Sequence, residues 1–223
     1  MKNTLTLMVK LLILYFAILF LYNGVEYCSN VLFIKQFCIK YFYLSPGLAF
    51  DFTKNILLLI VSMSIMIILS RGHLWMFGIN SLKFKESLWR YLIYFIPYLS
   101  FVLLFGSNST SQIVNYNSNV TALFYYLFKI LIQPISFVIF YFGLLQSVIE
   151  KKIYPTNENI IYKLNTTILI IIIIFTYEYS RNDYPILVMT PLIILNSVTY
   201  LFTKSLLIPL IAQIIFSILL ILL

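Results

Sequence analysis

The sequence predicts an all-α fold: a polytopic bundle of about seven transmembrane helices in a single domain over residues 1–223. Hydrophobic residues make up 62% of the chain and charged residues only 10%, which is too little polar surface for a water-soluble domain. Apolar runs of about 20 residues, long enough to cross a bilayer, recur along the whole chain. These runs must be helices, because lipid offers the backbone no hydrogen-bond partners and the alternating pattern of outer-membrane strands is not visible.

The predicted spans follow one another along the chain. The fourth is longer than one crossing needs, so we expect it to tilt or to extend past the bilayer, and Pro134 inside it predicts a kink. The short segment 180–183 forces the fifth and sixth spans into an antiparallel pair. The first span lacks a small-residue cleavage site, and we expect a retained helix. The seven spans are 5–23, 52–70, 89–106, 119–149, 161–179, 184–202 and 205–223.

Charges between the spans predict the orientation. Segment 106–118 carries no charge, whereas positive residues cluster in 71–90 and 150–163. Because positive loops stay in the cytoplasm, we predict a multi-pass protein of the cell membrane with its amino end inside and its carboxyl end outside. Residues 24–51 then form an outer loop, although two lysines there run against the rule. The cytoplasmic set is Lys2, Arg71, Lys83, Lys85, Arg90, Lys151, Lys152, Lys163 and Lys204, and the outer pair is Lys35 and Lys40.

The remaining polar residues exclude several function classes. The net charge of +8 is a topology signal, because nucleic-acid binding needs a basic face on a soluble domain. Cys28 and Cys38 either pair in an oxidising compartment or stay as two thiols, and they have no companion metal ligands. His73 is expected to be a solvated interface residue. With no Gly-rich phosphate loop, we expect no cofactor and no metal.

Charged residues inside membrane spans are energetically costly and are often functional. Lys10 and Lys129 lie where their side chains can snorkel to an interface. Glu178 lies near the outer end of the fifth span, with Arg181 close enough in sequence to pair with it. We interpret all three as structural. Hydrogen bonds between helices, worth on the order of 1 kcal/mol, are expected from Gln133, Gln146 and Gln213.

Residues 134–152, PISFVIFYFGLLQSVIEKK, resemble the first catalytic motif of the CPBP family, the CAAX proteases and bacteriocin-processing enzymes also called Abi proteins. That motif has two glutamates, three further residues, then an arginine followed by glycine and leucines. Gly143 and the two leucines after it agree, as does the basic helix end. The glutamates fall on Phe137 and Val138, and the arginine falls on Phe142.

The resemblance extends to the family's two later motifs and covers about residues 70–220. In the second, a phenylalanine is followed four residues later by a histidine; Phe175 is kept and Tyr179 takes the histidine position. In the third, a histidine is followed four residues later by an asparagine; Gln213 and Ser217 stand there. Segment 76–105 is similar to the cytoplasmic entry into a core helix of the family.

The resemblance implies an inactive relative of an intramembrane protease. Family members are thought to use a glutamate as base, and a base must accept a proton near the working pH, which Phe137 and Val138 cannot do. We therefore expect an emptied cavity lined by Phe137, Phe142, Tyr179 and Gln213. It would hold another membrane protein or a hydrophobic peptide, in a scaffold role or in self-immunity against a bacteriocin.

Two alternatives from other classes stay open. One is an active protease in which Glu178, next to the second motif, replaces the lost base. Successive helix residues point about 100° apart, so Glu178 lies off the face of Tyr179. The other is a permease subunit of a small transporter, which would depend on a separate ATPase. The abundance of Ile, Asn, Lys, Tyr and Phe fits an AT-rich prokaryotic genome.

Overall fold

The computed structural model describes residues 2–31, 33–42, 44–79, 89, 91–93, 95–100, 119–153, 160–178 and 186–222. Within these ranges all regular secondary structure is helical, which confirms the predicted all-α class. The α-helices are α1 (Lys2–Val31), α2 (Phe33–Phe42), α3 (Pro46–Ser70), α5 (Asn119–Leu127), α6 (Gln133–Phe137), α7 (Ile160–Glu178), α8 (Ile186–Thr203) and α9 (Leu207–Leu222). A 3₁₀ turn, η1 (Leu74–Phe77), and three π-helical segments, η3 (Phe128–Ile132), η4 (Val138–Gln146) and η5 (Ile149–Ile153), complete them.

Three helical stretches within the described residues are long and apolar enough to cross a membrane. They are Leu12–Asn30, Pro46–Ser70 and Thr121–Lys151. The other four predicted spans contain shorter apolar helices, Tyr91–Ser100, Asn165–Ile174, Thr190–Thr203 and Leu207–Leu219. The membrane class is therefore supported by three helices, and seven crossings stay a prediction.

The amino-terminal boundary differs from the prediction. The expected outer loop 24–51 is largely helical, because α1 continues to Val31 and α2 follows at once. A lone Gly24 does not end the helix, and the Ser29 hydroxyl donates to the Val25 carbonyl at 2.6 Å within it. The first effective stop is Ser45–Pro46, where Ser45 caps α3 and Pro46 occupies its first turn.

Helix α3 shows how the sequence sets helix ends and packing. At its start Ser45 Oγ accepts a hydrogen bond from the Leu48 amide at 3.3 Å. At its end Arg71 adopts a left-handed φ of 52°, and the Gly72 amide donates to the Ile67 carbonyl at 3.0 Å. Its buried face is rich in small residues, which allow helices to approach closely in lipid: Ala49, Thr53, Leu58, Ser62, Met66 and Ser70.

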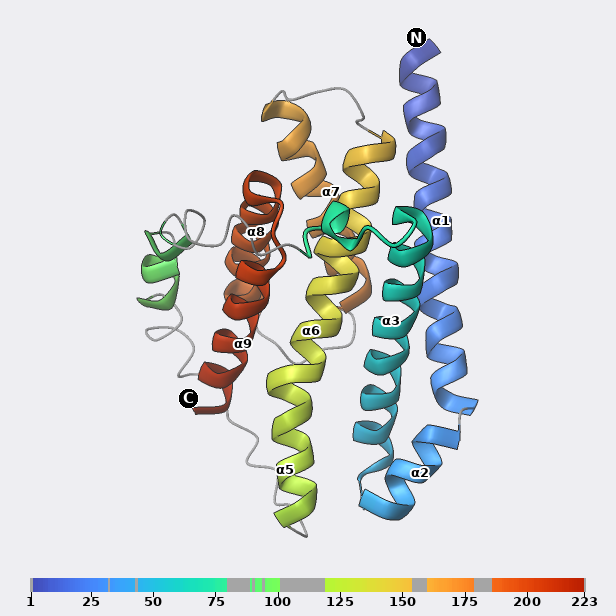
Figure 1. The fold of residues 1–223 in the computed structure, drawn as a ribbon, viewed down its shortest axis with the longest axis vertical. Coiled ribbons are helices and arrows are strands. Elements are labelled where there is room, and N and C mark those ends of the chain that lie inside the picture. The colour runs from blue at the N-terminus through green and yellow to red at the C-terminus, as the bar shows by residue number, and fades with distance from the viewer. Residues whose placement is uncertain are drawn as a thin grey trace.

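The helices run back and forth along one axis of the bundle (Figure 1). From the N-terminus α1 descends beside α3, which returns upward, and α3 also packs against α2, α6 and η4. The column from α5 through α6 to η4 climbs through the centre, and α9 descends to the C-terminus. Figure 1 therefore places the start of α1 and the end of α9 toward opposite ends of the bundle.

The central column is the core. Val138, Phe140, Tyr141 and Phe142 of η4 are all fully buried. On α7, Ile170 and Ile174 are buried, whereas Ile168 and Ile172 on the other face are exposed. This spacing gives α7 one face toward the bundle and one toward lipid.

The predicted kink at Pro134 takes the form of a change in helix type. Pro134 lies in the first turn of α6, directly after the π-helical segment η3. Proline has no backbone amide hydrogen to donate, and a π-helical turn accommodates such a break in the α-helical ladder. The column continues past Pro134 to residue 153 (Figure 1).

Candidate functional site

The positions that match the first family motif lie in the centre of the bundle. Val138 and Phe142 are 0% exposed, and Phe137 is partly buried. The ring centroids of Phe137 and Phe142 are 6.0 Å apart. The Tyr141 ring is 4.8 Å from Phe137. The aromatic rings at and beside the motif positions therefore pack against one another.

The later motif positions are only partly described. Tyr179 and the side chain of Phe175 lie outside the described residues. Gln213 of α9 is 5% exposed, and its Oε1 accepts from Asn196 Nδ2 at 3.3 Å. Ser217 donates to the Gln213 carbonyl at 2.9 Å, a bond within α9 itself. Gln213 therefore joins α9 to α8, as predicted for a buried glutamine.

A first buried polar network joins η4, α7 and α8. Gln146 Nε2 donates to the Ser197 carbonyl at 2.9 Å. The Ser197 hydroxyl lies 3.2 Å from both Gln146 Oε1 and Thr167 Oγ1. Because all three side chains are buried, these bonds replace water for groups that would otherwise be costly to bury.

A second network lies one residue away along α8. The Tyr91 hydroxyl donates to Asn196 Oδ1 at 2.9 Å, and Asn196 continues to Gln213. Tyr91, Phe95 and Tyr98 pack here against Leu192, Ile208 and Phe216. Neighbouring residues of α8 thus bind to different helices, Ser197 to η4 and Asn196 to α9.

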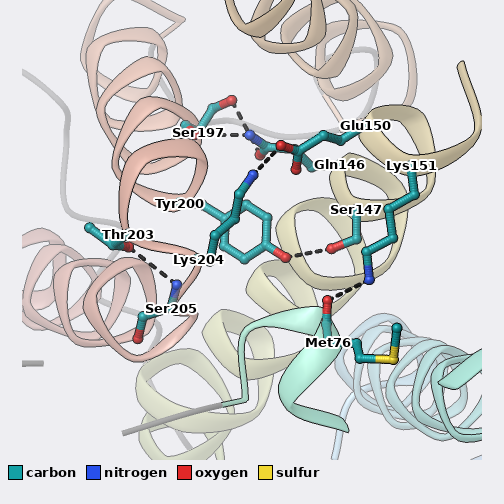
Figure 2. Close-up of polar contacts among 10 residues, drawn as sticks. All are labelled: Met76, Gln146, Ser147, Glu150, Lys151, Ser197, Tyr200, Thr203, Lys204 and Ser205. Carbon is teal, nitrogen blue, oxygen red and sulfur yellow. Dashed lines mark hydrogen bonds and ion pairs between the residues drawn. The ribbon is translucent and has the colours of Figure 1, made fainter. Parts of the chain in front are cut away.

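Figure 2 shows a third set of contacts, at one end of η4 and α8. Ser147 and Tyr200 share a short hydrogen bond, and Lys204 pairs with Glu150. Lys151 Nζ donates to the Met76 carbonyl at 2.7 Å and lies 4.8 Å from the Phe77 ring centroid. Segments after α3, after η4 and after α8 therefore meet at the same end, as expected if all are cytoplasmic.

The chemistry available in this core is hydrogen bonding between neutral groups. Among the residues that the structure describes, the buried polar side chains are serine, threonine, asparagine and glutamine, together with tyrosines and Cys38. None of the buried residues in these ranges is a carboxylate, histidine, lysine or arginine. The two networks hold helices together, and neither offers a carboxylate base.

Charged side chains instead gather at the other end of the bundle, in a cavity that sequence reasoning missed. The cavity of about 30 Å³ is lined by both apolar and charged residues of α3, η3 and α6. The signal was visible, because Lys54 lies inside the predicted second span and Asp51 directly precedes it. Of the residues predicted to act, Phe137 reaches this cavity. Its lining is Asp51, Lys54, Asn55, Leu58, Phe128, Lys129, Gln133 and Phe137.

The other singled-out residues are exposed or at helix ends. Lys10 and His73 are exposed, and Lys129 lies against the Tyr125 and Phe128 rings at 5.9 and 5.8 Å. Glu178 is the last residue of α7, and its side chain lies outside the described residues.

The two cysteines are both free thiols. Cys28 on α1 is exposed and Cys38 on α2 is buried. Burial raises the pKa of the Cys38 thiol, because a thiolate is poorly solvated away from water.

Together the long apolar helices and the neutral buried networks define an α-helical membrane protein. Beyond that class, no protein-family model, curated protein or solved structure matches the chain. The residues and their contacts are therefore the basis for assigning a function.

Proposed function

We propose that the protein is a catalytically inactive relative of the CPBP intramembrane proteases that acts by binding another membrane protein or a hydrophobic peptide. The observation that carries this proposal is the packing of η4. The positions that match the paired glutamates and the arginine are occupied by Phe137, Val138 and Phe142, and the last two are fully buried. None of these three side chains carries a carboxylate, so they cannot supply the general base that the family uses.

The proposed topology is seven crossings with the amino end in the cytoplasm. The contacts between Lys151 and Met76 and between Lys204 and Glu150 support it, because they gather three positively charged connections at one end. In this proposal the other four crossings are made by the segments that contain the shorter apolar helices. Positive charges on one side of a bilayer set orientation.

Phe137 is the position we propose for contact with the partner. It is only partly buried, whereas Phe142 is enclosed by the bundle. A partner helix or peptide would therefore meet the Phe137 side of the aromatic stack and not Phe142. Scaffold and self-immunity roles share this contact and differ in whether the partner is a protein of the same cell or a secreted peptide.

The test is photo-crosslinking in native membranes. A benzoylphenylalanine at position 137 should capture a single protein or peptide identified by mass spectrometry, and the same probe at Ile172 is the control. Ile172 is 54% exposed on the lipid-facing side of α7, so it should capture lipid only. Lipid adducts alone at both positions would overturn the proposal.

The protease alternative is tested by Glu178→Gln, which removes the nearest carboxylate to the second motif without changing its size. We expect the captured partner and the cellular phenotype to be unchanged. Loss of a cleavage product together with retained partner capture would identify Glu178 as a base and contradict the inactive assignment.

A further inference from the structure

The cavity at the α3 start lies close to one membrane boundary. Lys54 follows Pro46 by eight residues, so it stands roughly 12 Å along α3 from the helix start. The short helix α2 lies beside this end and contacts both α3 and α5, with Lys35 and Lys40 on it. From this depth the Lys54 ammonium can, by snorkelling, approach a headgroup that enters this end of the bundle.

The charge of the lining favours an anion. Lys54 and Lys129 contribute two positive charges and Asp51 one negative charge. Aromatic neighbours hold both ammonium groups. Lys54 Nζ donates to the Tyr22 hydroxyl at 3.0 Å and lies 5.2 Å from that ring centroid, and Lys129 packs on Tyr125 as described above.

The walls of the cavity are fixed by hydrogen bonds between α3 and α6. Ser136 donates to Asn55 Oδ1 at 2.6 Å, and Asn55 Nδ2 donates to the Asp51 carbonyl at 2.9 Å. The first bond joins the α6 wall to the α3 wall, and the second, within α3, orients the Asn55 amide.

One acceptor in the wall needs a donor. Gln133 Oε1 is buried and has no hydrogen-bond partner within the described part of the chain, a state that costs free energy unless a donor arrives. The Asp51 carboxylate is a second acceptor in the same lining. The lining therefore combines a net positive charge with one buried amide oxygen that has no partner among the described residues.

We propose that this cavity binds a phosphodiester whose headgroup carries a hydrogen-bond donor, as in phosphatidylglycerol or phosphatidylethanolamine. Phosphate oxygens lie on Lys54 and Lys129, and the hydroxyl or ammonium donates to Gln133 Oε1. A volume of about 30 Å³ is a few times what one water needs, so the tip of a headgroup enters while the acyl chains stay in the bilayer. The inference depends on the membrane location and not on the inactive-protease assignment, although Phe137 belongs both to the cavity lining and to the proposed partner contact.

The experiment is native mass spectrometry of the full chain in mild detergent, after delipidation. Dioctanoyl phosphatidylglycerol, phosphatidylethanolamine and phosphatidylcholine are titrated separately, together with glycerol 3-phosphate. We expect the first two to bind at least about tenfold more tightly than phosphatidylcholine, whose trimethylammonium lacks a donor. Equal binding of phosphatidylcholine would overturn the proposal. Equal binding of glycerol 3-phosphate would support the site and assign a soluble phosphate ester as its ligand.

Charge-neutralising variants distinguish binding in the cavity from general attraction to surface charge. Lys54→Gln and Lys129→Gln should each weaken headgroup binding about fivefold, which is what one lysine near an anionic lipid surface contributes. Lys40→Gln makes the same charge change on exposed α2 and should leave binding unchanged. If Lys40→Gln weakens binding as much as Lys54→Gln, attraction is nonspecific and the proposal fails.

A variant that keeps Lys54 and Lys129 tests the role of the Gln133 amide oxygen. Gln133→Leu should abolish the preference over phosphatidylcholine while binding of the phosphate persists. Gel filtration of each variant checks folding, and Lys54→Arg, which retains the charge, serves as the conservative variant that keeps binding. A persistent preference in folded Gln133→Leu would contradict the assigned role of this amide.

Discussion

Gly78 and Gly72 share a positive φ, of 83° and 87°, but differ in what surrounds them. A Cβ at Gly78 would lie 2.6 Å from the Tyr200 ring and 3.0 Å from the Lys204 carbonyl oxygen. A Cβ at Gly72 would meet nothing within 4 Å. The carbonyl of Gly78 also accepts from the Leu206 amide at 2.8 Å, so this glycine seats the 71–79 segment against the connection between α8 and α9.

We predict that Gly78→Ala destabilises the protein more than Gly72→Ala. Both carry the cost of an L-residue at positive φ, about 1–2 kcal/mol, but only Gly78→Ala adds a clash with the Tyr200 ring and a tight approach to the Lys204 carbonyl. The measurement is the unfolding midpoint in detergent mixtures. Equal losses in the two variants would show that φ alone matters and that the close approach to Lys204 does not.

Cys38 gives a prediction about pH. Because burial raises the pKa of its thiol, the reactive thiolate is scarcer in the folded protein than in the unfolded one at pH 8, and its alkylation should accelerate with pH beyond the usual thiol range. We expect alkylation at least about tenfold slower than in the protein unfolded in dodecyl sulfate. Peptide mass spectrometry over a pH series measures it, and equal rates in both states would contradict the burial.

At the scale of elements, hydrophobicity predicts where helices lie but not how they are wound. The fourth span was expected at 119–149, and Thr121–Lys151 is one continuous apolar stretch. Its π-helical segments were not foreseen, because the apolar content of VIFYFGLLQ is the same in either helix type. The winding decides which rings meet: the Phe137 centroid lies 4.8 Å from that of Tyr141 and 6.0 Å from that of Phe142.

Ser197 and Ser217 allow the interhelical network to be tested with one kind of substitution. Ser197 links α8 to Gln146 and Thr167 on two other elements, whereas Ser217 bonds within α9. We predict that Ser197→Ala costs about 1 kcal/mol, in the range for hydrogen bonds between membrane helices, and that Ser217→Ala costs much less. Steric-trapping unfolding free energies distinguish them. A larger loss for Ser217→Ala would contradict the network's role.

At the scale of the whole molecule, the sequence predicts class and segment order better than function. The membrane class and seven apolar helical segments follow from composition, since lipid excludes unpaired backbone groups. The loop predicted at 24–51 is largely helical, since Gly24 alone does not end a helix and α1 continues to Val31 before α2 begins. Lys54 was overlooked although it lies in a predicted span, and the cavity around it needs three elements to meet, which sequence spacing does not give.

The orientation of the molecule in the membrane can be tested by chemical labelling. Two exposed positions at opposite ends report it, His73 after α3 and Lys40 on α2. In a variant free of Cys28 and Cys38, His73→Cys should react with a membrane-impermeant maleimide only after lysis, whereas Lys40→Cys should react in intact cells. The reason is that the contacts of Lys151 and Lys204 place the positively charged connections at the His73 end, which the bilayer potential and insertion machinery keep inside. Labelling of His73→Cys in intact cells would reverse the orientation. In that case the headgroup cavity would face the inner leaflet, where anionic lipid is enriched, and its ligand would come from that leaflet.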